Sequence, residues 1–179
     1  MRDLSFSVTK EVVDLGVKII TARITGVQNT NSNTEFETYK NSELEKVKQE
    51  WESKKYRDDP ILAGFRDLHT KVGRSNRDYV ASPEGLRWLF LERGRFPHVN
   101  TLVDIYNLIS VKTGLALGAH DIDKVQGNIA LRFTKGDEIF IPLSDSSLSY
   151  LHGVLYRKMD IYGMAQHKTR KGFEALSSS

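Results

Sequence analysis

The sequence predicts an α+β fold, with helices in the middle of the chain and strands toward both ends. Two observations support this class. Capped, amphipathic segments gather between residues 42 and 114, whereas alternating or β-branched apolar segments come before and after them. Helices and strands that are segregated along a chain are typical of α+β proteins rather than of alternating βαβ units. A chain of 179 residues suits one hydrophobic core, so we expect a single domain over residues 1–179.

The composition is that of a globular protein, and it limits the chemistry that the chain can perform. Hydrophobic residues make up 39% and charged residues 27%, which is ordinary for such proteins. The absence of cysteine excludes disulfides, thiolate zinc sites and a cysteine nucleophile. No apolar run of about 18 residues and no apolar leader are visible, so we expect a cytoplasmic protein without a membrane partner. The formal net charge of +3 permits nucleic-acid binding without arguing for it.

Short segments precede the helices. Residues 4–8 alternate between apolar and polar side chains, which predicts a strand. Residues 11–15 indicate a short helix that Gly16 closes. Residues 17–24 are almost continuously apolar and rich in β-branched side chains, which predicts a strand buried on both faces. Residues 28–34 have the composition of a loop.

Three helices are expected before the centre of the chain, and each has recognisable start and stop signals. The first begins at Ser42, where Glu45 completes a capping box. It carries one apolar stripe among many charges, so we expect a surface helix that lies on the core. The second and third begin at Asp59-Pro60 and Ser82-Pro83, with proline in the first turn, and end before glycines 73 and 94.

The most informative stretch runs from Phe96 to Leu131 and begins with a fourth helix. Thr101 is its expected N-cap, Asp104 completes a capping box, and Gly114 ends the helix. One face is apolar at i, i+3, i+4 and i+7, with Leu102, Ile105, Tyr106 and Ile109, and Val103 and Leu108 extend that face. So much of the circumference is apolar that we expect this helix to be buried.

A narrow polar stripe follows the same helix and consists of Asn100, Asp104 and Asn107. A buried polar group without a partner costs about 1–3 kcal/mol. The stripe therefore either ties the helix to neighbouring loops or faces a cavity. We expect Asp104 and Asn107 to form hydrogen bonds with backbone groups of adjacent loops.

Strands are expected again after the central helix. Residues 128–133 alternate and should form a hairpin with residues 139–141 across a Lys135-Gly136 turn. Residues 153–156 have the pattern of another strand, and residues 157–173 are basic and irregular.

Familiar catalytic motifs are missing, which leaves a small group of titratable residues after the central helix. The chain has no phosphate-binding glycine loop, no nucleophile elbow and no zinc-protease motif. Gly118 and Ala119 leave space beside His120, which either acts as a general acid or base or is hydrogen-bonded into the polar stripe. Asp121 is expected to cap a short turn. His120, Asp121 and Asp123 could together bind a metal ion, but the sequence offers no further ligand at helical spacing. We therefore expect neither a metal nor another cofactor.

Basic and aromatic side chains are interleaved between residues 87 and 98. The basic members are Arg87, Arg93 and Arg95. Together with Trp88 and Phe96 they suit single-stranded RNA, through stacking and phosphate contacts. The alternative is a helix with a core tryptophan and solvated arginines. A second basic group further along the chain consists of Lys168, Arg170 and Lys171.

An ordered set of residues in the central stretch carries a resemblance to a family: Pro97, Asn100, Val103-Asp104, Asn107, Gly114, Leu117, Ala119 and residues 121–124. The set resembles the B3/B4 domain of the phenylalanyl-tRNA synthetase beta subunit, which edits wrongly charged tRNA. It is most similar to free-standing members, in which an Ala-His-Asp run replaces the His-Ala-Phe-Asp run of the subunit. The resemblance is strongest over residues 82–143, while residues 144–179 diverge. It implies a layered domain with helices packed on a β-sandwich-like sheet portion.

The resemblance also implies a function. The partner would be tRNA or aminoacyl-tRNA rather than DNA. The reaction would be hydrolysis of a mischarged ester in trans by a positioned water, without a covalent intermediate or cofactor. Gly118 stands where the synthetase has an editing histidine, and the editing glutamate has no counterpart. A non-catalytic RNA- or amino-acid-binding module and a protein-interaction domain are the alternatives.

The implied pocket lies between the central helix and the turn at residues 114–121. Its floor would be formed by Asn100, Asp104 and Asn107. Gly118 and Asp121 would line it, and His120 would face it as the proton acceptor.

Overall fold

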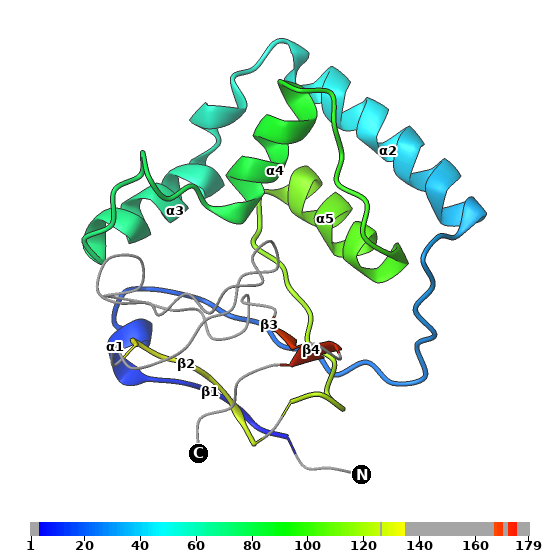
Figure 1. The fold of residues 1–179 in the computed structure, drawn as a ribbon. Helices are drawn as coiled ribbons and strands as arrows, with labels where there is room; N and C mark the ends of the chain where they lie inside the picture. The colour runs from blue at the N-terminus through cyan, green and yellow to red at the C-terminus, as the bar shows by residue number, and fades with distance from the viewer. Residues whose placement is uncertain (1–3, 126, 135–166, 170–171, 175–179) are drawn as a thin grey trace. The chain divides into compact units, whose positions relative to one another are not determined.

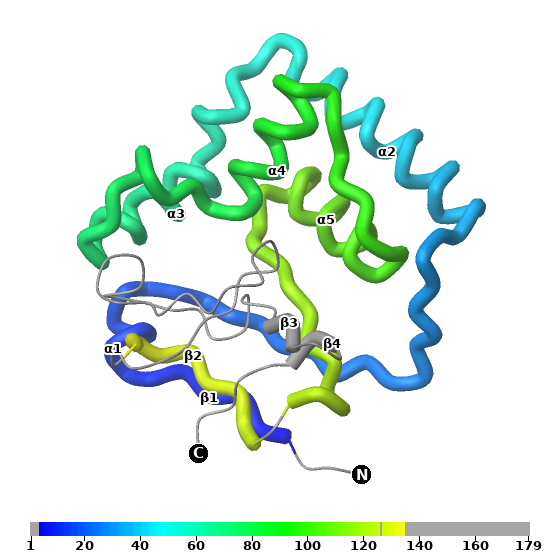
Figure 2. Tube along the Cα trace, in the orientation of Figure 1, coloured from blue at the N-terminus to red at the C-terminus, as the bar shows by residue number. Residues whose placement is uncertain are grey.

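The computed structural model describes residues 4–125, 127–134, 167–169 and 172–174 (Figure 1). The chain divides into two compact units. The sheet unit consists of Met1–Arg23 and Ala119–Ser179, and the helical unit is Ile24–Gly118. Figure 2 traces both, with the helical unit in light blue to green. Each unit is described by itself below.

The sheet unit is built on two strands from distant parts of the sequence. Strand β1 (Phe6–Val8) pairs in parallel with β2 (Ile129–Leu131), so that Val8 lies opposite Leu131. This confirms the strands expected in residues 4–8 and 128–133. Helix α1 (Lys10–Val13) follows β1 and buries Val12 completely. Gly16 closes the turn after it with a φ of 82°, a left-handed conformation that glycine adopts without strain.

A second pair of strands lies near the end of the chain. Strand β3 (His167–Thr169) pairs antiparallel with β4 (Gly172–Glu174). The hairpin partner expected at residues 139–141 and the strand expected at residues 153–156 lie outside the described residues. Helices together with short paired strands agree with the α+β class.

The buried strand expected over residues 17–24 is wrong, because this segment forms neither helix nor strand. Ile20 is 97% exposed and Ile24 is 69% exposed. The described strand pairs are β1–β2 and β3–β4, so none of these strands pairs with the segment. Apolar β-branched side chains favour an extended backbone, but a strand also needs a neighbour that satisfies its N–H and C=O groups.

The helical unit contains four α-helices and a short turn of 3₁₀-helix. They are α2 (Thr34–Glu52), η1 (Tyr56–Asp58), α3 (Pro60–Lys71), α4 (Ser82–Leu91) and α5 (Thr101–Thr113). The expected starts of α3 and α4 are confirmed, with proline in the first turn of each helix. No helix in this or any other described part of the chain has the length and apolar character needed to cross a membrane.

The start expected for the first of these helices is wrong. Helix α2 begins eight residues before Ser42, at Thr34, and its N-cap is Asn33, which accepts a hydrogen bond from the backbone N–H of Phe36 at 2.8 Å. The Ser42 hydroxyl donates instead to the carbonyl of Tyr39 within the helix. A serine followed three residues later by glutamate fits both a capping box and a helix interior, so the motif alone did not identify the end.

Helix α5 supplies the centre of the helical core. Leu108 and Val111 are 3% and 0% exposed and pack against Leu44 and Val47 of α2. Partly buried side chains surround this cluster: Phe36, Trp51, Leu86, Phe90, Leu91 and Phe96. The helix is thus buried along one side, as its apolar sequence predicts.

The orientation expected for α5 differs from the observed one. Its buried stripe consists of Asp104, Leu108 and Val111, whereas Ile109, assigned to the apolar face, is 40% exposed. Asn100 rather than Thr101 is the N-cap, and its side chain accepts from the N–H of Val103 at 3.0 Å. A helix that is apolar around most of its circumference does not fix its own rotation, so its neighbours decide which side is buried.

Truncation of Leu108 tests this rotation of α5. Leu108→Ala should lower the free energy of unfolding by roughly 2–5 kcal/mol, because it leaves a cavity between α2 and α5. Ile109→Ala is the matched control and should cost much less, since that side chain is exposed. Chemical denaturation measures both. Equal losses would contradict the observed rotation.

Candidate functional site

Asp104 is a fully buried carboxylate with three hydrogen-bond donors around it. The Nζ atom of Lys40 lies 2.8 Å from its Oδ2 atom, and Nδ1 of His98 lies 2.7 Å from the same oxygen. The other oxygen, Oδ1, accepts from the backbone N–H of Val99 at 3.1 Å. The expectation that Asp104 bonds a backbone group of an adjacent loop is confirmed. Asn107, the next member of the polar stripe, is half-buried.

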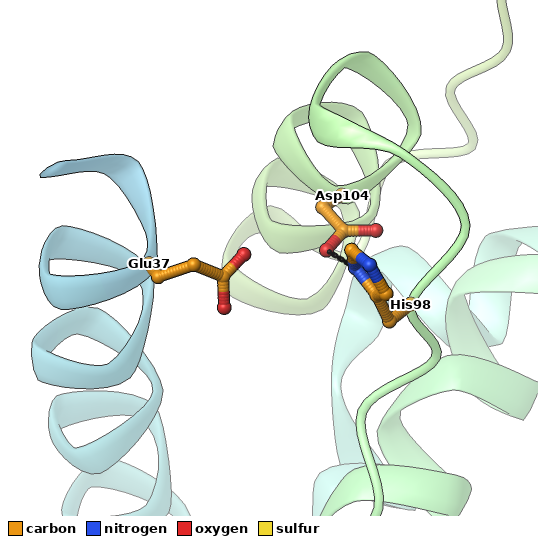
Figure 3. Close-up of side chains that lie close together, drawn as sticks. All are labelled: Glu37, His98 and Asp104. Carbon is orange, nitrogen blue, oxygen red and sulfur yellow. Dashed lines mark hydrogen bonds and ion pairs between the residues drawn. The ribbon is translucent and has the colours of Figure 1, made fainter. Parts of the chain in front are cut away.

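The site is assembled by two helices and one loop. Glu37 and Lys40 lie three residues apart on α2, which places their side chains on the same face of that helix. The loop of residues 96–99 runs directly into α5, so that His98 and Val99 reach back to Asp104 in the first turn. Figure 3 shows Glu37 extending from α2 toward the His98–Asp104 pair.

Lys40 neutralises the buried carboxylate. Its Nζ donates to Asp104 and to Oε1 of Glu37, each at 2.8 Å, and the residue is only 5% exposed. The rings of Phe36 and Phe96 lie 5.8 and 5.5 Å from the ammonium. An ammonium held at such a place without partners would be strongly destabilising, so the two carboxylates are what permits its burial.

The pairing keeps both partners charged over the ordinary pH range. Burial acts to lower the pKa of Lys40, but the hydrogen bonds to Asp104 and Glu37 outweigh it, and the pKa is raised. Burial likewise acts to raise the pKa of Asp104, but hydrogen bonds from His98 and Lys40 outweigh it, and that pKa is lowered. Asp104 is therefore an ionised carboxylate that only accepts hydrogen bonds.

This ionisation fixes the orientation of the His98 ring. Because Asp104 only accepts, Nδ1 of His98 must carry a hydrogen and donate it. The lone pair of the neutral ring then lies on Nε2. The side chain of His98 is 53% exposed and borders a groove of about 440 Å³. The groove is lined by Ser32, Glu37, Lys40, Asn41, Leu44, Phe96 and His98.

The same residues raise the question of a metal. One ligand atom from each of Glu37, His98 and Asp104 lies within 4.8 Å of the others. However, the Lys40 ammonium already bonds an oxygen of each carboxylate. A metal ion bound by all three groups would compete with this cation, so the cluster is better described as an ammonium site with a histidine at its edge.

Arg87, expected to contact RNA, is 1% exposed and lies inside the helical unit. Its Nε donates to the carbonyl of Val111 at 2.8 Å, and its Nη1 pairs with the carboxylate of Asp59. The guanidinium carbon lies 4.6 Å from the centre of the Trp51 ring. Arg87 lies on the side of α4 that meets the C-terminal end of α5. Its guanidinium therefore donates to carbonyls in the last turn of α5, which have no partner within that helix. Its burial argues against the expected phosphate contact.

The other basic residues expected to bind RNA differ in their placement. Arg93 and Arg95 are exposed, and the guanidinium carbon of Arg93 lies 5.0 Å from the centre of the Trp88 ring. Trp88 itself is 38% exposed, which makes it a surface side chain rather than a core one. Lys168 lies in β3, and Arg170 and Lys171 lie outside the described residues.

The pocket expected beside the 114–121 turn draws its residues from both units. Gly118 is exposed and ends the helical unit, whereas His120, half-buried, and Asp121 belong to the sheet unit. The expected pocket therefore stays a prediction. The cap expected at Asp121 is confirmed, since its Oδ1 accepts from the N–H of Asp123 at 3.0 Å.

Sequence reasoning missed the groove because its residues are far apart in the chain. Lys40 lies 64 residues before Asp104, and nothing in the local pattern of either helix pairs them. The available signal was Asp104 itself, since a carboxylate on an apolar helix requires a cation or several donors.

Comparison with protein families places the chain beside a known domain family. The model of the family described as B3/4 domain matches residues 65–164, which is more than half of the chain. The matched region includes α4, α5 and the loop that carries His98. A search of curated proteins and a search of solved structures each found no match.

Proposed function

Because the chain belongs to the B3/4 domain family, we propose that it binds aminoacyl-tRNA in the cytoplasm and hydrolyses the ester of a wrongly attached amino acid. The family is linked to the phenylalanyl-tRNA synthetase beta subunit. The observation that carries the proposal is the family match over residues 65–164. The hydrolysis takes place in trans, on tRNA charged by another protein.

The surface after α4 supports binding of the single-stranded end of tRNA. Trp88 presents an exposed ring, and Arg93 stacks on it. Arg95 adds a second exposed positive charge close by in the sequence. Bases stack on aromatic side chains and on guanidinium planes, while arginines bind phosphates, so this combination suits RNA without requiring one sequence.

The groove of the helical unit supports the hydrolytic step. It offers an exposed imidazole held by a buried carboxylate, which can accept a proton from water. His120, expected from the sequence, and His98 are thus the two candidate proton acceptors. With either histidine as the proton acceptor, the hydrolysis proceeds without a covalent intermediate.

Single-turnover deacylation tests the proposed function. A panel of tRNAs charged with cognate and non-cognate amino acids is mixed with excess protein, and release of the labelled amino acid is followed against spontaneous hydrolysis. We expect at least one mischarged tRNA to be hydrolysed faster than the correctly charged one. Tight tRNA binding without any hydrolysis would instead favour the non-catalytic RNA-binding module.

Charge reversal at the exposed arginines tests the binding surface. The double variant Arg93→Glu/Arg95→Glu should weaken tRNA binding and flatten its dependence on salt concentration, because fewer counterions are released. The double variant Lys71→Glu/Arg77→Glu changes the net charge equally at exposed positions in and after α3, and is the matched control. Equal weakening by both variants would mean that net charge, and not this surface, governs binding.

A further inference from the structure

We propose that His98 is the general base of this hydrolysis, held by Asp104, and that the aminoacyl ester binds in the groove of α2 and residues 96–98. The inference rests on the proposed function and names the site and the substrate class for it. It assigns the catalytic role to a histidine of the helical unit rather than to His120.

The first argument is the geometry of the His98–Asp104 pair. Asp104 is fully buried, so water in the groove does not reach it. His98 is half-exposed and bonds it at 2.7 Å through Nδ1. A carboxylate that holds one ring nitrogen leaves the other as the acceptor and keeps the ring oriented, which is the arrangement of a base supported by a third group.

The second argument is the rigidity of the carboxylate. Asp104 is fixed by Lys40 and by the N–H of Val99 in addition to His98. It cannot rotate away from the ring without losing charged or backbone hydrogen bonds in a buried place. The imidazole is therefore held before a substrate arrives, and such preorganisation is what makes a catalytic group effective.

The third argument is the charge around the ring. The groups that face it are Asp104 on α5 and Lys40 and Glu37 on α2. The Asp104 oxygen that bonds Nδ1 at 2.7 Å therefore lies next to the ring on which positive charge develops when it takes a proton from water, and this contact stabilises that charge.

The groove also indicates the substrate class. Its volume of about 440 Å³ falls in the usual range for small-molecule sites. Leu44 and Phe96 offer apolar surface for an amino-acid side chain. Glu37, whose side chain is 36% exposed, offers a carboxylate to an α-ammonium group. We infer an ester of an apolar amino acid with a free amino group.

The reaction follows from these roles. Nε2 of His98 takes a proton from water while the water oxygen attacks the ester carbonyl carbon. In the tetrahedral intermediate the bond from that carbon to the ribose oxygen then breaks, and the imidazolium returns the proton to the ribose oxygen. The products are the free amino acid and tRNA with a restored terminal hydroxyl.

The test compares His98→Asn with the parent on mischarged tRNA and on a p-nitrophenyl ester of an apolar amino acid. Asparagine can keep an N–H toward Asp104 but has no basic nitrogen. The variant should hydrolyse both substrates roughly 100-fold or more slowly, in the range that general bases contribute. Its tRNA affinity and melting temperature should stay near those of the parent. Val80→Ala, at an exposed side chain of the helical unit away from the groove, is the control.

The pH profile separates a catalytic role from a structural one. The parent should lose rate toward acid pH, because a protonated imidazole cannot accept a proton from water. The residual rate of His98→Asn should lack this acid limb. An unchanged acid limb in the variant would assign the base to another group.

The substrate class is tested on the amino group. Acetylating it should raise the KM of the ester for the parent. Glu37→Gln should raise the KM of the free-amine ester and leave that of the acetylated ester nearly unchanged. Equal KM values of both esters for the parent would overturn the assigned amino-group contact.

The remaining outcomes are also decisive. Full activity in His98→Asn together with its loss in His120→Ala would overturn the proposal, as would a rate that chelation removes and added Zn²⁺ restores. If the parent cleaves the small ester through His98 but no aminoacyl-tRNA, the proposed function fails while the His98 base stands. If the parent cleaves neither substrate, the His98 base is refuted.

Discussion

Replacing Arg87 by methionine should lower the free energy of unfolding by about 3–5 kcal/mol, the usual cost of removing one partner of a buried ion pair. The variant leaves Asp59, only 9% exposed, without its cation. It also removes the donors to the carbonyls of Val111 and Lys112 at the end of α5. The carbonyl of Val111 then loses its arginine donor in a buried place, which adds to the cost. Urea denaturation measures the loss.

Two further variants make the result specific. Arg93→Met removes an exposed arginine just after the same helix and should change stability by less than about 0.5 kcal/mol. Arg87→Lys keeps the charge but loses the planar fork, so it should recover only part of the stability. If Arg87→Met unfolds like Arg93→Met, the buried network around Asp59 does not hold the helical unit together.

Gly114 lies next to the buried ion pair of Arg87 and Asp59. Gly114 ends α5 with a φ of 72°, which favours glycine. A Cβ atom there would lie 3.3 Å from Nη2 of Arg87 and 3.4 Å from Oδ2 of Asp59. The glycine that the sequence marks as a helix stop thus also leaves room for the buried ion pair.

Asp104→Asn should lower the free energy of unfolding by up to about 3–5 kcal/mol, because it leaves the buried ammonium of Lys40 without its main partner. The loss should lie toward the lower end, since Glu37 still bonds that ammonium at 2.8 Å. Glu37→Gln is the control at the edge of the groove and should cost below about 1 kcal/mol. Denaturant titrations at neutral pH compare the two.

A double variant and the pH dependence test whether the lost ion pair between Lys40 and Asp104 causes the loss of stability. In the double variant Lys40→Met/Asp104→Asn the only carboxylate left without its cation is Glu37, whose side chain is 36% exposed and reaches water, so most of the stability should return. The pKa of Asp104 is lowered by folding. Its contribution is therefore present above about pH 4 and is lost as pH falls through the lowered value. The difference between parent and Asp104→Asn should shrink in acid, and a difference that is constant with pH would contradict this explanation.

The sequence predicted the ends of those helices that have a capping residue, a proline or a glycine at the boundary itself. Helix α3 begins at Pro60 with Asp59 as the cap, as expected, because proline and a capping carboxylate act within one turn. Glycine at position 114 likewise marks the end of α5 in the sequence and in the structure. The capping pattern at Ser42 failed, since a serine three residues before a glutamate also occurs inside helices.

The residues of the candidate site likewise fall into those that the sequence indicates and those that it does not. The sequence singles out Asp104, because a carboxylate on an apolar helix must find partners. It leaves His98 in a basic and aromatic stretch and Lys40 on what reads as a charged surface helix. The pattern also places Arg87 among exposed arginines, because a sequence pattern alone does not distinguish a solvated arginine from one that satisfies the carbonyls of another helix.

Within the part of the chain that the structure describes, the sequence by itself determined where most helices begin and end and which short segments become β1 and β2. It also determined that α5 is buried with a paired carboxylate. These properties depend on caps, periodicity and desolvation, which act on one turn or one side chain. Only the tertiary structure decided the rotation of α5, the burial of Arg87 and Lys40, and the joining of His98 to Asp104 at a groove. The burial of Arg87 and of Lys40 depends on contacts with residues 24 and 64 positions further along the chain, which no local pattern encodes. His98 is only six residues from Asp104, but the bond between them depends on how the loop before α5 folds back onto the helix.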